Sequence, residues 1–500
     1  MPHLPQPSCQ VLIVGAGPTG VALANLLGCY GVQTQLIERH VGVTQIPRAV
    51  HLDGETMRTF QSMDMATELL SVLRQGSCMH WVNAEGKVLL VREGINGLGS
   101  HGWHNNNYYH QPHLEEALRR GLDRFDHVHL CEGWEVTQIA QDAQGASVSV
   151  RDTDGNTQTL QAQYVVGCDG ARSMVRDLMG DDQGFDDLGE HQAWLVVDGV
   201  LNRPLDLPEF SVQYCDPKRP ATGIFVNALR RRWELMLLPG EDPQALTRED
   251  KVWELISPWV KPSQARLERA ATYTFHSLIT KRWQNGRLFV AGDSAHQTPP
   301  FLGQGLCAGI RDAANLGWKL AHALQHPDSA QAVLQTYGPE RTPHAKAFVQ
   351  LAVDVGQIIQ ELDPVKAAQR DERLLREGMA FTFPSPPLGE GMHRAAPERA
   401  PVGQVAPQFE MPDGLWSDDH AKRGWSIWVL PECKLDATTR ALADQWDMTF
   451  VSATAPRMAD WLRNHQAVAA VLRPDHYLFD LCDCDAALQT SLQTLSRFQS

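Results

Sequence analysis

The chain has 500 residues, of which 43% are hydrophobic and 21% are charged, a composition typical of a globular protein with two or three domains. Its net charge of -15 argues against nucleic acid as a partner, because phosphate binding requires a basic surface. There is no apolar run of 18 residues and no signal-peptide pattern, so we expect no membrane span. Ten scattered cysteines without a CxxC pair predict free thiols in a reducing cytoplasm, and no metal site.

The first element is a strand, a tight turn and a helix, predicted from VLIVGAGPTG at residues 11–20. The predicted strand at 33–37 ends in Glu38, about 20 residues downstream, where a ribose hydroxyl would bind, and Arg39 follows it. A lone GxGxxG motif is weak evidence, but the flanking strand, helix and acid together predict dinucleotide binding. The three glycines allow the turn, the approach of a pyrophosphate and close helix packing, in the order Gly15, Gly17 and Gly20.

A second strand-to-helix junction follows at residues 164–176, which read YVVGCDGARSMVR. The strand ends at Asp169-Gly170, and Ser173 is placed to cap the next helix. Arg172 and Arg176 would lie close to this turn. Alone, the segment fits an ordinary structural junction equally well, and only its place between two other motifs favours a functional role.

The sequence pattern differs in residues 181–280, where it predicts a sheet. Alternating apolar and polar residues are separated by turns, which is the pattern of strands with one covered face. We expect this sheet to form the roof of a substrate pocket. Its predicted strands start at Trp194, Phe210, Thr222 and Trp233.

The chain then returns to the first domain with RLFVAGDSAHQTPPFLGQGLC at residues 287–307. We predict a strand at 288–291, a Gly-Asp turn, a loop whose φ angles are restricted by Pro299 and Pro300, and a long helix from about Leu306. A helix N-terminus offers unpaired N–H groups and favours negative charge, as the pyrimidine edge of a reduced flavin requires. His296 is interpreted as a structural, hydrogen-bonded histidine.

The three motifs, in this order and spacing, resemble those of the single-component (class A) FAD-dependent aromatic hydroxylases over roughly residues 10–350. PPFLGQGLCAGIRDAANLGWKL, at 299–320, is most similar to the 3-(3-hydroxyphenyl)propionate hydroxylase and phenol hydroxylase branch. The resemblance implies an α/β fold with a Rossmann-like FAD-binding domain of the p-hydroxybenzoate hydroxylase type and an α+β, sheet-containing substrate domain.

Beyond a proline-rich break at Pro384, the segments starting at Val402, Ser426 and Val468 resemble the thioredoxin-like tail of the phenol hydroxylase branch. The tail has no CxxC, so dithiol chemistry is not expected, and a docking or dimerisation module is favoured. The predicted domains are a FAD-binding domain in two parts (1–180 and 281–384), a substrate sheet (181–280) and the tail (385–500).

The resemblance also implies roles for single residues. The glycines meet the FAD pyrophosphate and Glu38 the adenosine ribose, while Asp293 holds the ribityl and pyrophosphate portion. Arg48 lies near the phosphates and the NAD(P)H path, and Gln111 touches the ribityl chain. Asp169 and Arg172 form a second fingerprint for FAD and NAD(P)H. The flavin wall and the amides facing the pyrimidine ring come from Pro299, Pro300, Gly303, Gly305, Leu306 and Cys307. A surface ion pair for Arg48 and a helix-start role for Gln111 remain alternatives.

The implied reaction is hydroxylation of a phenolic ring, such as that of a 3-hydroxyphenylpropionate-like acid. NADPH or NADH reduces non-covalently bound FAD, O2 forms the flavin 4a-hydroperoxide, and the ring attacks the distal oxygen. No catalytic base can be identified from the sequence, and a homodimer is possible. Candidate substrate contacts, each with plain core packing as the alternative, are Trp194, Tyr214, Phe225, Met236 and Phe301.

Two other functions stay open at this point. One is a different flavin enzyme on the same fold, such as an epoxidase, a polyketide-tailoring oxygenase or a reductase. The other is a non-catalytic FAD-binding scaffold, against which the intact glycine, Asp169 and Asp293 motifs argue.

Overall fold

The structure is a computed structural model that describes residues 4–45, 48–76, 78–93, 97–180, 184–377, 385–394, 401–433 and 435–499. The predicted break at Pro384 lies outside these residues. Among the residues described, no helix is long and apolar enough to cross a membrane, and no group of three potential metal ligands is present.

The first sheet has parallel strands at its centre. Its central strand β1 (Ser8–Val14) is almost wholly buried and lies between β2 (Thr34–Glu38) and β11 (Thr157–Gly167), parallel to both. Strands β8 (Val128–Glu132) and β18 (Leu288–Val290) extend it in parallel on the two sides. The antiparallel strands β9 (Trp134–Gln141), β10 (Ala146–Asp152) and β17 (Gln284–Asn285) complete it.

Two helices pack together against this sheet. Helix α1 (Pro18–Cys29) follows β1 directly, and the long helix α8 (Gly305–Gln325) packs against it. The buried side chains of both helices join those of the sheet in one apolar core. Further cover comes from α2 (Gly54–Ser62), α3 (Ala66–Leu69), α4 (Gln111–Arg120) and α5 (Met174–Asp177).

The second sheet contains all four predicted strands. They lie in β12 (Phe185–Leu201), β13 (Ser211–Tyr214), β14 (Ala221–Phe225) and β15 (Arg230–Met236), and β16 (Ala265–Thr280) pairs with β12. The sheet also takes strands from outside 181–280: β5 (Cys78–Val82), β6 (Val88–Glu93) and β19 (His296–Gln297). One face is covered by α7 (Glu249–Ile256), with α6 (Pro243–Leu246) before it.

A small sheet connects the two larger ones. Strand β7 (Asn107–Tyr109) pairs with β3 (His51–Leu52) and β4 (Leu73–Gln75). Single helical turns lie at η1 (Leu70–Val72), η2 (Gly121–Arg124), η3 (Gly292–Ser294), η4 (Pro300–Leu302) and η5 (Ser496–Gln499).

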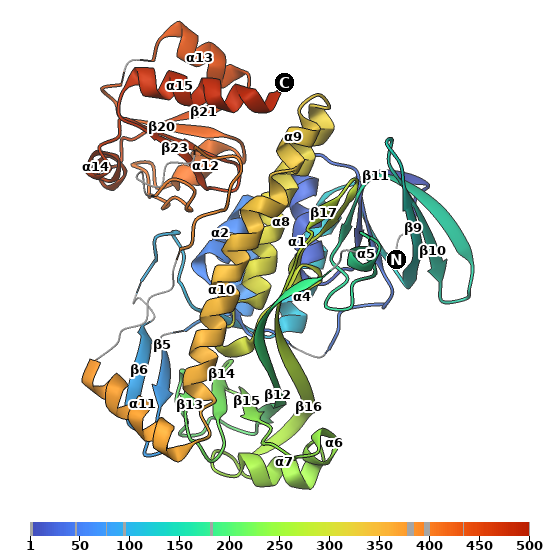
Figure 1. Cartoon of the computed structure of the whole chain (residues 1–500), viewed down its shortest axis with the longest axis vertical. Coiled ribbons are helices and arrows are strands. Elements are labelled where there is room, and N and C mark those ends of the chain that lie inside the picture. The colour runs from blue at the N-terminus through green and yellow to red at the C-terminus, as the bar shows by residue number, and fades with distance from the viewer. Residues whose placement is uncertain are drawn as a thin grey trace.

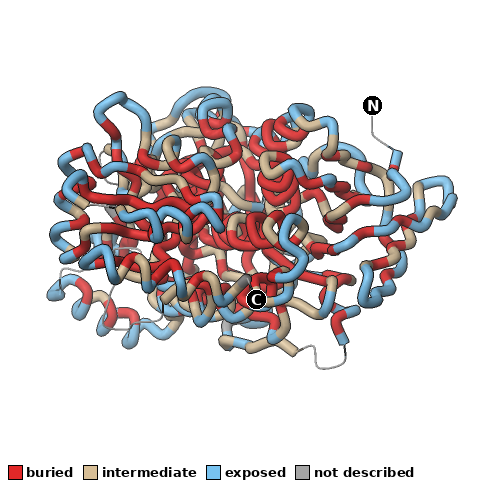
Figure 2. The backbone as a smooth tube through the Cα atoms, turned by 90° about the horizontal axis from the view of Figure 1, so that it is seen from above, coloured by how far each residue is buried: buried red, intermediate tan, exposed pale blue. Residues whose placement is uncertain are grey.

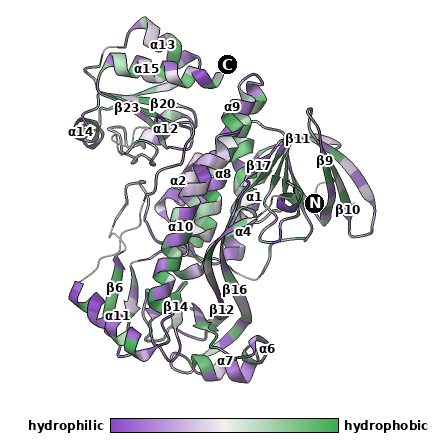
Figure 3. Cartoon of the chain, viewed as in Figure 1, coloured by the Kyte–Doolittle hydropathy of each residue, from purple (hydrophilic) through white to green (hydrophobic). Residues whose placement is uncertain are grey.

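Long helices link the parts of the chain. After α9 (Ala330–Leu334), helix α10 (Tyr337–Ile359) runs beside α8 and contacts β12 and β16 of the second sheet (Figure 1). Helix α11 (Pro364–Glu377) then crosses β6, and Figure 3 shows hydrophilic residues along much of it.

The C-terminal unit, residues 401–499, is built on a four-stranded sheet in the order β21-β20-β22-β23. These strands are β20 (Ser426–Val429), β21 (Thr449–Ser452), β22 (Ala469–Leu472) and β23 (Leu478–Cys482); β20 and β21 are parallel, and the other neighbours are antiparallel. The described residues of this unit form the helices α12 (Ser417–Ala421), α13 (Ala437–Asp444), α14 (Pro456–Asn464) and α15 (Asp485–Leu495).

The C-terminal unit packs on the rest of the chain through an apolar cluster. Trp318 of α8 lies edge-to-face against Trp425, with ring centroids 5.7 Å apart, and Val333 of α9 belongs to the same cluster. Figure 2 shows buried segments running through the middle of the molecule, with exposed segments around its periphery.

Candidate active site

The glycine turn after β1 is shaped by two close backbone approaches and one open space. Gly15 has a φ of +99°, and a Cβ there would lie 2.5 Å from the carbonyl oxygen of Cys168. A Cβ on Gly20 would lie 2.1 Å from the carbonyl oxygen of Gly15. A Cβ on Gly17 would meet no atom within 4 Å. The fold therefore requires Gly15 and Gly20, whereas Gly17 borders space in which another molecule can approach the N-terminus of α1.

Glu38 lies at the end of β2, beside this turn. Its Oε2 accepts a hydrogen bond from Ala16 N (2.9 Å), and its Oε1 accepts one from His40 N (2.9 Å). Arg119 of α4 donates to the carbonyl of Ala16 (2.9 Å) and pairs with Glu132. Arg39 is exposed, and its Nε contacts the neighbouring His40 ring.

The second and third motifs are joined through Asp169 and Ser294. Asp169 Oδ1 accepts from the hydroxyls of Ser173 (2.5 Å) and Ser294 (3.1 Å), and Oδ2 accepts from Met174 N (2.7 Å). Gly170 N donates back to Ser294 Oγ (2.9 Å). Ser173 caps α5, as predicted, by accepting from Arg176 N.

The two arginines of the second motif differ in environment. Arg176 is buried and donates to the carbonyls of Ser294 (3.2 Å) and Ala171 (3.1 Å), which ties the motif to the turn after β18. Arg172 is exposed and remains accessible to a ligand.

Asp293 follows β18, at the same end of the sheet. Asp293 is exposed to solvent at this turn. Desolvation by the surrounding protein raises the pKa of Asp293, and the electrostatic influence of His296 and Arg48 opposes the rise. The structure thus brings Arg48, which is exposed, into the neighbourhood of Asp293.

Gln111, the first residue of α4, fixes the segment that carries Arg48. Its Oε1 accepts from Arg48 N (2.5 Å) and Ala49 N (2.7 Å), and its Nε2 donates to Glu115 (2.7 Å). A carboxamide nitrogen has two donor hydrogens, and only one of those of Gln111 has a partner among the described residues, so the other can donate to a ligand.

The proline loop ends in a left-handed turn before α8. Gly303 has a φ of +64°, and a Cβ there would lie 3.0 Å from His51 Cβ. Helix α8 begins at Gly305, one residue before the predicted start, and a Cβ on Gly305 would again meet nothing within 4 Å. Pro299 is buried, and Leu306 is half-buried. Burial raises the pKa of Cys307 to about 12, so this residue is a neutral thiol.

Sequence reasoning missed a buried polar group behind the proline loop. His51 Nε2 lies 3.0 Å from Asn106 Oδ1, and Arg92 Nη2 donates to the same oxygen (2.5 Å). Burial, assisted by the charge of Arg92, lowers the pKa of His51 to about 4, so its imidazole is neutral. These residues come from separate segments that only the small sheet and β6 bring together, so local sequence carried no signal.

Tyr109 of β7, two residues before Gln111, also lies in this region. It is 1% exposed, and its hydroxyl has no hydrogen-bond partner among the described residues. Burial raises its pKa well above the usual value, with Cys307 and Glu115 adding to the effect. The hydroxyl therefore stays protonated and can donate to a ligand.

Three of the five candidate substrate contacts cluster. Trp194 lies edge-to-face against Phe301 of the proline loop (5.5 Å between centroids) and opposite Met236 in the β12–β15 register. All three are buried in one cluster on the sheet face away from α7. The other two lie elsewhere: the Tyr214 ring contacts Trp259 (5.2 Å between centroids), and the guanidinium groups of Arg74 and Arg231 both lie over the Phe225 ring.

The same sheet face carries buried polar groups. Thr222 donates to Gln213 Oε1 (2.5 Å), and Gln213 Nε2 lies 3.4 Å from the carbonyl of Phe301. Arg232 pairs with Asp198 (2.8 Å) and donates to the carbonyl of Arg48 (2.7 Å). The face thus connects the proline loop with the Arg48 segment.

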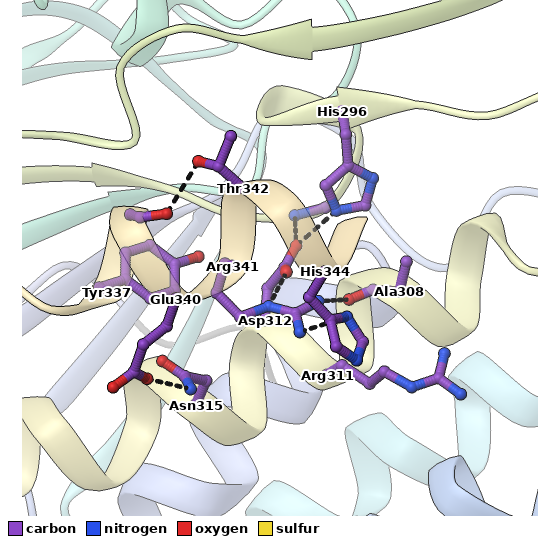
Figure 4. Close-up of polar contacts among 12 residues, drawn as sticks. His296, Ala308, Arg311, Asp312, Asn315, Tyr337, Glu340, Arg341, Thr342 and His344 are labelled. Carbon is purple, nitrogen blue, oxygen red and sulfur yellow. Dashed lines mark hydrogen bonds and ion pairs between the residues drawn. The ribbon is translucent and has the colours of Figure 1, made fainter. Parts of the chain in front are cut away.

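His296 is hydrogen-bonded, in agreement with the structural role predicted for it. Its Nε2 lies 2.7 Å from Asp312 Oδ2 on α8, and the same oxygen accepts from Gly292 N (2.9 Å). Figure 4 shows the two side chains facing each other.

Comparison with known proteins places these features in context. Residues 8–352 match the family described as FAD binding domain. The chain is 36% identical to the probable NADH-specific resorcinol 4-hydroxylase of Rhodococcus jostii (strain RHA1), over 94% of this chain and 92% of that protein. It is 35% identical to the 3-(3-hydroxy-phenyl)propionate/3-hydroxycinnamic acid hydroxylase 2 of Burkholderia vietnamiensis (strain G4 / LMG 22486), over 94% of this chain and 93% of that protein.

Solved structures show the same fold. The flavin-dependent monooxygenase PieE, solved in complex with FAD and substrate, superposes with a TM-score of 0.83 over 100% of both chains at 19% identity. Aklavinone-11 hydroxylase, in a ternary complex with FAD and aklavinone, superposes with a TM-score of 0.82 over 99% of this chain and 100% of that chain at 22% identity.

Proposed function

Because this chain belongs to the FAD-binding-domain family and is an FAD-dependent aromatic hydroxylase, we propose that its substrate is a small meta-substituted phenol. Resorcinol and 3-(3-hydroxyphenyl)propanoate, named for two relatives, share a phenol ring with a second substituent in the meta position. The observation that carries the cofactor part of the proposal is that three motifs, far apart in sequence, converge at the carboxyl ends of β1, β11 and β18.

The residues present fit FAD. The open space at Gly17 and Gly305 leaves room for a group that uses the free N–H donors at the N-termini of α1 and α8. We propose that the turn formed by Gly15, Gly17 and Gly20 holds the pyrophosphate on the side of Gly17, with Glu38 at the ribose. Asp293, Arg48 and Gln111 would hold the central part of the cofactor, with Asp169 and Arg172 at the second fingerprint. The bound flavin supplies the hydride acceptance and O2 activation that side chains lack.

The proposed substrate pocket lies between the proline loop and the face of the second sheet that α7 does not cover. Trp194, Met236 and Phe301 provide its apolar wall and exclude water. Gln213 and Thr222 offer polar atoms on the same face. The Tyr109 hydroxyl, which has no hydrogen-bond partner among the described residues, could donate to a ligand. We leave Tyr214 and Phe225 out of the pocket, because their contacts lie elsewhere.

We propose the domain division 1–180, 181–280, 281–384 and 385–500, with β5 and β6 assigned to the substrate sheet. The C-terminal unit fits a thioredoxin-like fold, because β20, α13, β21, α14, β22, β23 and α15 follow one another in that topology, with sheet order 2-1-3-4. A homodimer and a reducing compartment remain predictions.

Stopped-flow reduction of the flavin by NADH and NADPH, with a panel of phenols, tests this function. The name of the Rhodococcus relative leads us to propose NADH as the donor. We expect resorcinol or 3-(3-hydroxyphenyl)propanoate, but not their para isomers, to accelerate reduction and to yield hydroxylated product in near-equal amount to NADH consumed. Reduction accompanied only by peroxide with every meta-substituted phenol would refute the substrate class, and absence of FAD binding would refute the cofactor site.

A further inference from the structure

A chain of buried polar contacts runs from the third motif into the C-terminal unit. Asp312 accepts from Gly292 N and lies 2.7 Å from His296, and its other oxygen accepts from Arg341 Nε (2.8 Å). Arg341 Nη1 lies 2.9 Å from His344 Nδ1, and Figure 4 shows these groups facing one another between α8 and α10. His344 Nε2 then lies 3.1 Å from the hydroxyl of Tyr477.

The direction of each hydrogen bond in this chain follows from chemistry. A guanidinium only donates, so His344 Nδ1 must accept, and the proton of the neutral ring is on Nε2. Burial lowers the pKa of His344 well below its usual value, which agrees with a neutral ring. His344 Nε2–H therefore donates to the Tyr477 oxygen, and the Tyr477 hydroxyl is left to donate to Glu55 Oε1 (2.9 Å).

The chain continues from Glu55 back to α8. Glu55 Oε2 accepts from Arg311 Nε (2.6 Å), and Arg311 also pairs with Asp53 (2.5 Å). Its Nη1 donates to Oε1 of Gln304, the residue that precedes α8 (3.1 Å). Since Arg311 and Asp312 are neighbours on α8, the contacts form a closed loop around the first turns of that helix.

Among the residues that form this closed ring of contacts, Tyr477 is the one that belongs to the C-terminal unit. It lies in the β22–β23 loop (residues 473–477), which enters the rest of the molecule at several points. Arg473 pairs with Glu340 of α10 (2.9 Å), Asp475 accepts from Asn315 of α8 (3.1 Å), and His476 bonds Ser62 of α2 (2.8 Å). The side chains of this loop therefore contact α2, α8 and α10 together.

We propose that Tyr477 is a positioning residue of the flavin site, through which the C-terminal unit fixes the N-terminal end of α8. The inference rests on the proposed FAD site at Gly305. Without its hydroxyl, the buried His344 Nε2–H and Glu55 Oε1 would both lose a partner. Unpaired buried groups are costly, so Glu55 and Arg311 would rearrange, and Gln304 at the start of α8 would move with Arg311.

Tyr477→Phe tests the proposal, because it removes only the hydroxyl. Tyr30→Phe is the matched control: its hydroxyl also bonds the C-terminal unit, donating to the Arg423 carbonyl (3.3 Å), but it does not join the loop around α8. FAD dissociation constants are measured by titrating the apoprotein, and flavin midpoint potentials by redox titration. We expect Tyr477→Phe to weaken FAD binding about tenfold and to shift the potential, and Tyr30→Phe to leave both unchanged.

A double variant separates positioning from general loosening. If Tyr477 acts through Glu55, adding Glu55→Gln to Tyr477→Phe should weaken FAD binding less than the sum of the two single effects. Values for Tyr477→Phe equal to wild type, or equal losses in Tyr477→Phe and Tyr30→Phe, would overturn the inference. Failure of the wild-type chain to bind FAD would instead count against the proposed function.

Discussion

At the scale of single residues, the first motif separates glycines that the fold needs from one that a ligand needs. Gly20 faces a backbone oxygen, whereas Gly17 faces open space and has a φ of -73°, which any residue can adopt. Glycines of one motif therefore have different roles. The sequence pattern suggests these roles by analogy with other dinucleotide-binding turns, and the contacts of each glycine in the structure identify them.

This difference gives a prediction for Gly17→Ala. Its methyl group would strain nothing in the protein but would occupy the space proposed for the pyrophosphate. We expect the free energy of unfolding of the apoprotein to change by less than about 0.5 kcal/mol, and the FAD dissociation constant to rise by about tenfold or more. Denaturant unfolding and flavin titration measure the two effects.

Gly20→Ala is the contrasting variant. Its Cβ would lie 2.1 Å from a main-chain oxygen, so β1 and α1 must separate, and the apoprotein itself should lose stability. Tight FAD binding by the Gly17→Ala variant would show that the pyrophosphate does not lie beside Gly17.

The polar residues behind the proline loop show where reasoning from sequence ends. Glycine motifs act through local backbone geometry, so they are readable over ten residues. His51, Arg92 and Asn106 meet only because β3, β6 and β7 are placed together, and none of them stands in a local pattern.

At the scale of elements, the contact between α1, η3 and α8 depends on small residues. A Cβ on Gly309 would lie 2.3 Å from Thr19 Oγ1 and 3.2 Å from Gly292 Cα. Gly317, two turns later on α8, has ordinary contacts only, the nearest being Leu26 Cβ at 3.4 Å.

We therefore expect opposite effects from two alanines in one helix. Gly309→Ala should destabilise the protein by about 1–3 kcal/mol through overpacking. Gly317→Ala should be neutral or should stabilise it by up to about 1 kcal/mol, because alanine favours helix. Thermal or denaturant unfolding measures both changes.

Thr19→Ala provides the rescue. It removes the hydroxyl that the new methyl group meets, so the double variant should recover part of the stability lost in Gly309→Ala. If Gly309→Ala proved as stable as Gly317→Ala, this packing would not constrain α8.

Element prediction succeeded where hydrophobic periodicity is strong. The strands after Trp194, Phe210, Thr222 and Trp233, and the helix after the proline loop, follow from alternation and turn residues. Strands β5 and β6 were not foreseen as part of the second sheet, because pairing between distant strands is set by tertiary contact.

At the scale of the whole molecule, a second buried ion cluster joins α8, α10 and the β22–β23 loop. Glu340 accepts from Lys319 (2.6 Å) and Arg473 (2.9 Å), and all three side chains are inaccessible to solvent. Burial alone would raise the pKa of Glu340, but the charges of Arg473 and Lys319 outweigh it and hold the pKa well below 4.5. Burial lowers the pKa of Lys319 to about 8, with Glu340 opposing the shift.

The sign of the resulting pH dependence follows from Glu340. Because its pKa is lower in the folded chain than in the unfolded one, its carboxylate contributes stability above about pH 4.5 and loses that contribution as the pH falls through the folded value. Acid should therefore weaken the attachment of the C-terminal unit.

Glu340→Gln removes the charge while keeping the shape, and it leaves Lys319 and Arg473 buried without their common carboxylate. We expect a loss of about 3–5 kcal/mol at neutral pH, and a difference from wild type that shrinks as the pH falls below 4.5. Tryptophan fluorescence during denaturant unfolding measures this loss, and Trp318 and Trp425, which meet across the interface, contribute to the signal. Glu372→Gln, an exposed change on α11, is the control and should match wild type throughout. A constant difference between Glu340→Gln and wild type across this pH range would mean that the Glu340 carboxylate is not what makes the interface sensitive to acid.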